Sequence, residues 1–397
     1  MPGKKLIAEL TPEEEKRAAE VYKKAIVIEG LTYGPTLLDS EYPATLKASG
    51  VTATHFTALA PEDEVKEALL KIAFWLELEQ NNIVKIIRTA DDIVEAKQNG
   101  EVGIILGSQD LRYLQDHNPE NCVKLVNAFH QLGMRIIELA YLQQNYFGSA
   151  GVDKDAGLTF AGRRIVEEMN RVGVLIDVSH CGDNTVMDTI AHSQKPVVFT
   201  HANPRAVVDH PRNKTDEQIL ALAEKGGFMG ICSFAPISQV KEGIHPSIED
   251  LLDMIDYVVN LAGIDAVGIG LDLTPNWDFD PKAFEEYAKE NPLVAAWMNN
   301  DLTKKNAKGS ENCTKIINFA KGLVARGYSD EDIMKILGGN FLELFRKVWY
   351  FQFSLTRFSF GVEAGINIFL LNYHLSYASG NYYRQQKSRF LVKGRKA

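Results

Sequence analysis

The sequence predicts an α/β fold, a (β/α)8 TIM barrel. Eight short apolar runs rich in β-branched residues recur along the chain, and each is followed by a longer pattern with helical period. Continuous apolar strands that alternate with helices are typical of a parallel sheet. No GxGxxG motif follows the first run, and eight such units favour a closed barrel over a doubly wound open sheet.

The elements can be placed in order along the chain. Residues 1–24 are predicted to contain an N-terminal helix, because Thr11 reads as an N-cap and Pro12 as the first helical residue. Residues 25–349 form the predicted barrel domain. Its expected strands are 25–28, 51–54, 102–106, 135–139, 172–178, 196–199, 227–231 and 266–270.

Residues 350–397 form a basic, aromatic-rich tail of unpredicted structure. Residues 351–397 hold seven Lys/Arg, a single acid (Glu363) and ten Phe/Tyr, so this segment carries a net charge of +6. The whole chain has a net charge of −9, so residues 1–350 carry a net charge of −15. Three interpretations stay open for the tail: an interaction arm, a helix at a membrane surface, or sequence that is not native to the protein.

Composition excludes several classes of protein. The acidic balance argues against a general nucleic-acid binder, which needs a basic face. The four cysteines include no CxxC pair, which excludes a disulfide scaffold and a cysteine zinc cluster. No run of 18 apolar residues is present and the N-terminus lacks the apolar core of a secretory signal, so we expect a cytoplasmic protein without a transmembrane segment.

Catalytic groups of a TIM barrel are expected just past the carboxyl ends of its strands. His180 and His201 follow the fifth and sixth predicted strands, and Asp272 follows the eighth. Imidazole is a good zinc ligand, and a carboxylate can complete a site that leaves one position open for water. These three residues therefore predict a metal-assisted hydrolytic site.

The ordered blocks of sequence around these residues resemble the membrane (renal) dipeptidase family. The resemblance covers roughly residues 20–349, and its clearest blocks are 155–162, 168–173, 176–180, 199–202, 210–213, 225–227, 268–272 and 337–341. It implies a zinc-dependent barrel of the metal-dependent hydrolase type, within the amidohydrolase superfamily. It also implies that His180 and His201 bind the second of two zinc ions, that Asp272 takes a proton from metal-bound water, and that Arg212 grips the substrate carboxylate.

The chain departs from the family pattern at several ligand positions. Leu31 and Tyr33 stand where the family has a His-x-Asp motif after the first strand, and Gln109 stands where it has the glutamate that bridges both metals. Tyr141 replaces a substrate-facing histidine, and Asn145 follows it as a candidate substrate contact. These changes indicate a divergent branch that binds at most one zinc or other divalent ion per chain.

Three functional hypotheses follow. The first is a dipeptidase-like metallohydrolase that cleaves a small amide or dipeptide with metal-activated water. The second is a pseudoenzyme or binding protein that keeps the pocket and has lost the chemistry, which Leu31, Tyr33 and Gln109 favour. The third is lyase, decarboxylase or isomerase chemistry on a carboxylate-bearing metabolite. The expected partners are a small-molecule or dipeptide substrate and a second copy of the chain in a homodimer. Nucleic acid is not expected as a partner.

Overall fold

The structure is a computed structural model that describes residues 4–34, 41–152, 154–275, 279–290, 302–349 and the single positions 292, 295 and 298. The predicted tail, residues 350–397, lies outside the described residues. None of the helices in the described part of the chain combines the length and apolar composition that a membrane span requires.

The predicted barrel is confirmed, and its strands are parallel throughout. The first sheet has the order β1-β2-β4-β5-β6, with β3 paired to β4 off this path, and the second has the order β7-β8-β9. The strands of the described chain are β1 (Ile28–Tyr33), β2 (Ala53–Leu59), β3 (Lys85–Ile86), β4 (Gly103–Ser108), β5 (Met134–Glu138), β6 (Leu175–Asp177), β7 (Phe199–Ala202), β8 (Met229–Ile231) and β9 (Val267–Ile269).

The two sheets join at both seams. Asp177 at the end of β6 forms a parallel bridge with Val198 just before β7. At the other seam, Thr32 of β1 bridges Leu273 after β9, and the Tyr33 N–H donates to the Leu273 carbonyl at 2.7 Å. The eight strands other than β3 therefore close into one ring, as a TIM barrel requires.

Each predicted apolar run overlaps one barrel strand, but the boundaries differ. The clearest corrections are β1 and β7, which begin at the last residue of the runs 25–28 and 196–199 and continue into polar residues. The polar residues in question are buried: Glu29 and Thr32 in β1, and Thr200 and His201 in β7. Hydrogen bonds to other side chains and backbone groups compensate for their burial. The two-residue strand β3 was not predicted, since so short a segment carries no period.

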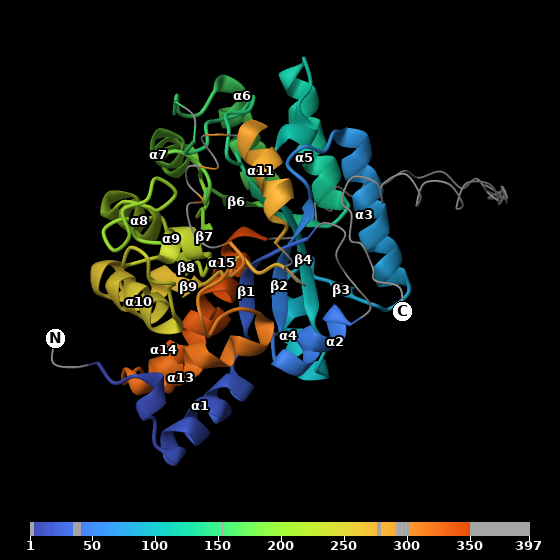
Figure 1. Cartoon of the computed structure of the whole chain (residues 1–397). Helices are drawn as coiled ribbons and strands as arrows, with labels where there is room; N and C mark the ends of the chain where they lie inside the picture. The colour runs from blue at the N-terminus through green and yellow to red at the C-terminus, as the bar shows by residue number, and fades with distance from the viewer. Residues whose placement is uncertain are drawn as a thin grey trace, which may run out of the picture. The chain divides into compact units, whose positions relative to one another are not determined.

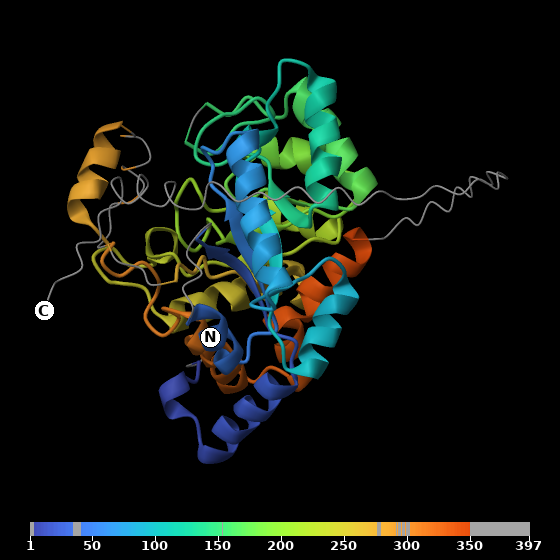
Figure 2. The ribbon, with the colours of Figure 1, turned by 90° about the vertical axis from the view of Figure 1, so that its right-hand side faces the viewer.

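Helices surround the strands, as Figure 1 shows. α1 begins after the N-cap Thr11, whose hydroxyl accepts from the Glu14 N–H, and it packs against α13. Figure 2 shows α11 standing away from the rest of the barrel. The α-helices are α1 (Pro12–Lys24), α2 (Tyr42–Ser49), α3 (Val65–Gln80), α4 (Ala90–Asn99), α5 (Pro119–Gln131), α6 (Phe160–Val172), α7 (Asp183–His192), α8 (Asp216–Glu224), α9 (Ala235–Ser238), α10 (Ile248–Ala262), α11 (Pro281–Glu290), α13 (Ile317–Ala325), α14 (Asp330–Met334) and α15 (Asn340–Val348).

The end of the barrel where the strands begin is filled with apolar side chains. Phe341 of α15 contacts Phe228 edge to face, with ring centroids 4.5 Å apart. The buried cluster they belong to also contains Ile28, Ala53, Ile105, Ile136, Leu175, Val198, Leu344, Phe345 and Val348. This packing leaves the carboxyl ends of the strands as the place for polar chemistry.

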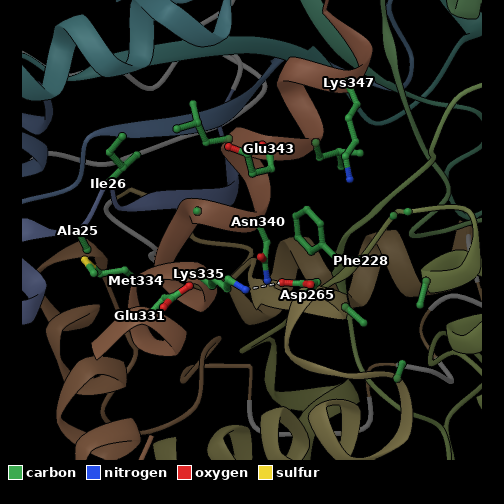
Figure 3. Close-up of a pocket in the computed structure, with 18 of the residues that line it drawn as sticks. Ala25, Ile26, Phe228, Asp265, Glu331, Met334, Lys335, Asn340, Glu343 and Lys347 are labelled. Carbon is green, nitrogen blue, oxygen red and sulfur yellow. Dashed lines mark ion pairs between the residues drawn. The ribbon is translucent and has the colours of Figure 1, made fainter. Parts of the chain in front are cut away.

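A cavity of about 650 Å³ lies at the same end as this apolar cluster (Figure 3). Its lining includes Ile26, Phe228 and Ala266, which precede β1, β8 and β9. Lys335 and Asp265 form an ion pair of 3.0 Å at its edge. The cavity is therefore separate from the residues that follow the strands.

Candidate active site

His180 and His201 meet at the carboxyl end of the barrel. His201 lies in β7, and His180 follows the end of β6 by three residues. Their Nε2 atoms are 2.9 Å apart and their ring centroids 5.0 Å apart. Burial lowers the pKa of both imidazoles well below the ordinary value, and nearby Arg212 adds to this effect. Both rings are therefore neutral near pH 7.

A hydroxyl and a carboxylate fix the protonation of His201. The Thr200 hydroxyl donates to the buried Asp177 carboxylate, so the Thr200 oxygen accepts from His201 Nδ1 at 2.7 Å. The Ser179 hydroxyl also donates to Asp177, at 2.6 Å. With the proton held on Nδ1, His201 presents its Nε2 lone pair to the site, as a metal ligand must.

Glu138, the last residue of β5, brings a carboxylate to the two histidines. It is fully buried, and its Oε1 accepts from the backbone N–H of His180. Burial raises its pKa well above the ordinary value, and the Asp177 charge raises it further. Glu138 was not predicted as a site residue, because it lies inside the fourth run and not after it. An acid inside a run of isoleucines and leucine could have pointed to it.

Gln109 follows β4 and lies between the histidines. Its Nε2 is 3.2 Å from His201 Nε2 and 3.5 Å from His180 Nε2, and its Oε1 accepts from the Thr57 hydroxyl at 3.2 Å. The position that the family resemblance assigns to a bridging carboxylate thus points into the site but carries a neutral amide.

Leu31 and Tyr33 lie at the end of β1. Leu31 is fully buried and its carbonyl accepts from the Leu273 N–H at 3.0 Å. Burial raises the pKa of the Tyr33 phenol to about 12, so it stays protonated. An alkyl group and a neutral phenol are not metal ligands at neutral pH. That these two positions are degenerate ligand positions stays a prediction.

Asp272 lies beyond β9 on a strained backbone, with φ of 55°. Lys305 donates to its carbonyl oxygen at 2.6 Å and to its Oδ1 at 3.2 Å. Burial raises the pKa of Asp272, while the Lys305 ammonium opposes the rise. Lys305 was not singled out from the sequence, since it lies 33 residues further along and carries no motif.

Arg212 lies behind the histidine pair. Its guanidinium donates to the Ser179 carbonyl and, at 2.7 Å, to the His201 carbonyl, and it is 5% exposed. In the structure it therefore holds the segment after β6 to β7. Contact with a substrate carboxylate stays a prediction.

Tyr141 reaches the site, and Asn145 supports the loop that carries it. The Tyr141 ring is 4.4 Å from the His180 ring, centroid to centroid. Asn145 donates to the Leu139 carbonyl at 2.8 Å, and its own carbonyl accepts from the Phe147 N–H at 2.8 Å. Both ends of the Asn145 amide are thus used within the chain, and its role as a substrate contact stays a prediction.

One divalent ion fits the donors that meet here. Glu138, His180 and His201 each offer one ligand atom, and these atoms all lie within 4.8 Å of one another. Two ligands of a tetrahedral zinc are about 3.3 Å apart, close to the separation of the two Nε2 atoms. Among the described residues, Glu138 Oε2 and His180 Nδ1 are buried without a hydrogen-bond partner. A cation that binds the Glu138 oxygen and separates the two imidazoles would remove part of that cost.

Glu29 is another buried carboxyl group, and its hydrogen bonds hold the barrel together. It accepts from the Leu271 N–H at 2.6 Å and from the Thr32 and Thr54 hydroxyls at 3.0 and 3.3 Å. These bonds tie β1 to β2 and to the end of β9. Burial raises the pKa of Glu29 to about 8.

Glu29→Gln is expected to change how stability depends on pH. Because the folded-state pKa is raised, Glu29 stabilises the fold fully below the unfolded pKa of about 4.3, and this is lost as pH rises through about 8. Glutamine stays neutral, so the variant should gain about 4 kcal/mol on the parent between pH 5 and pH 9. Thermal unfolding at both pH values measures this, with exposed Glu20→Gln as control. Equal shifts for both variants would contradict the assignment.

Two imidazoles and a carboxyl group gather at the carboxyl ends of the strands of a parallel barrel, which is where TIM-barrel enzymes place their active sites. Comparison with known proteins makes the assignment specific. The profile of the membrane dipeptidase family (Peptidase family M19) matches residues 16–307. The chain belongs to this family.

Curated relatives include several dipeptidases. Dipeptidase tcpJ of Claviceps purpurea is 27% identical over 268 residues, which are 67% of this chain and 55% of the relative. Mouse dipeptidase 3 is 25% identical over 239 residues, which are 58% of this chain and 43% of the relative. The chain thus spans about half the length of the curated relatives it matches.

Solved structures agree on the fold. An amidohydrolase from Pseudomonas aeruginosa is 33% identical with a TM-score of 0.74, over 84% of this chain and 99% of that one. A metallopeptidase from Rhodobacter sphaeroides, solved with a phosphinate mimic of the dipeptide L-Ala-D-Ala, has a TM-score of 0.66. It is 20% identical over 82% of this chain and all of that one, so it supports the fold alone.

Proposed function

We propose that the chain is a divergent dipeptidase-type metallohydrolase that cleaves a small amide or dipeptide with a free carboxylate. The observation that carries this proposal is the convergence of His180, His201 and the buried Glu138 on one point. These three residues would hold one divalent ion, zinc or another. Such an ion, when bound, lowers the pKa of water and polarises the carbonyl under attack.

The side chains around that point have separate tasks in the proposal. Asp272 accepts a proton from the attacking water and returns it to the leaving amine. Arg212 holds the substrate carboxylate with the N–H groups left after its bonds to the backbone carbonyls. Tyr141, next to His180, donates a hydrogen bond to the substrate because its phenol stays protonated.

Metal removal and restoration test the proposal. The full chain should hydrolyse at least one member of a dipeptide panel that includes L-Ala-D-Ala, lose activity on treatment with a chelator, and regain it with zinc or manganese. The expected metal content is one ion per chain. Absence of bound metal at every zinc and manganese concentration tried would overturn the proposal.

Gln109 supports a second candidate, a binding protein without hydrolytic activity. Its amide lies within 3.2 and 3.5 Å of the two histidine Nε2 atoms, where it can donate to their lone pairs in place of a metal. A chain that binds dipeptides, binds no metal and does not hydrolyse the dipeptides would fit this candidate. Metal binding without hydrolysis of the panel would instead favour lyase, decarboxylase or isomerase chemistry. The homodimer and the cytoplasmic location stay predictions.

A further inference from the structure

Lys305 is built into the mouth of the barrel next to Asp272. Its side chain is 8% exposed. Its ammonium donates to three oxygens: the Asp272 carbonyl at 2.6 Å, Asp272 Oδ1 at 3.2 Å and the Thr274 hydroxyl at 2.6 Å. It also lies 5.9 Å from the centroid of the Phe234 ring. An ammonium in such a setting is a fixed cation rather than a mobile surface group.

The backbone around Lys305 is held by the segment that follows β8. The Ala235 N–H donates to the Lys305 carbonyl at 2.8 Å, and Asn306 pairs with Phe234 in an antiparallel bridge. The Asn306 side chain donates to the Leu271 carbonyl at 2.8 Å. Segments after β8 and β9 therefore fix both Lys305 and its target.

Asp272 needs such support for two reasons. Its φ of 55° lies in the left-handed region, which is unfavourable for a residue other than glycine. Its side chain is also largely enclosed, at 18% exposed, and this desolvation favours the neutral form, which cannot accept a proton. On the neighbouring strand, Leu31 and Tyr33 bring no charge to offset this.

We propose that Lys305 is a positioning residue of the active site, whose ammonium holds the carboxylate and backbone of Asp272 ready to accept a proton. The inference rests on the proposed function. It also gives Asp272 a fixed positive charge as a neighbour. The charged and titratable groups that act electrostatically with Asp272 are Lys305, Arg212, Tyr33, Tyr141, Glu29 and Cys232.

Lys305→Met tests the proposal, with exposed Lys304→Met as the matched control. Lys305→Met should bind as much metal as the parent, but its kcat/KM for the dipeptide should fall by about 100-fold. The acid limb of its pH profile should move up by about 1 pH unit or more, because the Asp272 pKa rises when its cation is removed. Lys305→Arg should restore part of the rate and of the profile, and Lys304→Met should match the parent.

A thermal double-mutant cycle decides the pairing without using activity. Asp272→Asn and Lys305→Met should change the unfolding midpoint by amounts that do not add in the double variant, because each removes the charge interaction between the two side chains. Additive shifts would overturn the inference. So would an active parent whose rate and pH profile are unchanged in Lys305→Met. A parent that binds no metal and hydrolyses no dipeptide would instead refute the proposed function.

Discussion

Replacing both His180 and His201 with alanine is expected to remove the metal and the activity together. The variant loses two of the three ligand atoms that lie within 4.8 Å of one another, and Glu138 alone cannot hold a divalent ion. Loss of a group that merely supports a ligand costs 10- to 100-fold in affinity, so loss of two ligands should lower kcat/KM by more than about 100-fold. Metal content and dipeptide hydrolysis, measured on the same preparations, check this.

His192→Ala is the matched control for the histidine variant. His192 is the last residue of α7, and it pairs with Glu167 at 3.1 Å rather than with the site. It should leave metal content and hydrolysis at the level of the parent. If the double variant at 180 and 201 kept one ion per chain, the metal site would have to be elsewhere.

Asp272→Asn is expected to lower kcat while leaving the metal in place. Asparagine has nearly the same shape and keeps a backbone carbonyl for Lys305, but it cannot accept the proton of the attacking water. General acid–base groups contribute about 100- to 10,000-fold, which is the loss expected in kcat. KM should change much less, because the proposal gives Asp272 no part in holding the substrate.

Asp265→Asn provides the comparison for this variant. Asp265 precedes β9, its side chain is 78% exposed, and it pairs with Lys335 at the opposite end of the barrel. Its replacement should not affect kcat. An Asp272→Asn variant with the turnover of the parent would show that another group takes the proton.

The barrel could be predicted because strand burial leaves a direct trace in the sequence. Eight β-branched apolar runs mark eight strands, and the residues after them mark the functional end. The boundaries of β1 and β7 could not be predicted, because Glu29, Thr32 and Thr200 are buried through hydrogen bonds that only the closed barrel provides. A strand predicted from apolar residues alone ends at the first polar residue.

Site residues just past the apolar runs could be predicted from the sequence. Lys305, which a long connection brings back to the site, could not. His180 and Asp272 come after β6 and β9, and His201 lies near the end of β7, so topology brings them to one rim. Glu138 was missed because it is part of a strand. Lys305 was missed because a connection of 33 residues leads back to Asp272, and no periodicity encodes that return.

The roles of Arg212 and Asn145 illustrate a further limit of sequence reasoning. A residue type shows what a side chain can bind, but its partners depend on the folded backbone. Arg212 meets the carbonyls of Ser179 and His201, and Asn145 meets the Leu139 carbonyl. Both contacts stabilise backbone next to the candidate ligands, which the sequence alone does not reveal.

The most direct test of the central claim is anomalous diffraction at the zinc absorption edge from crystals of the zinc-loaded chain. One peak is expected per chain, bounded by His180 Nε2, His201 Nε2 and a Glu138 carboxylate oxygen, with the Lys305 ammonium still bonded to Asp272. An absent peak, or a strong peak away from these three residues, would contradict the claim that they form a metal site.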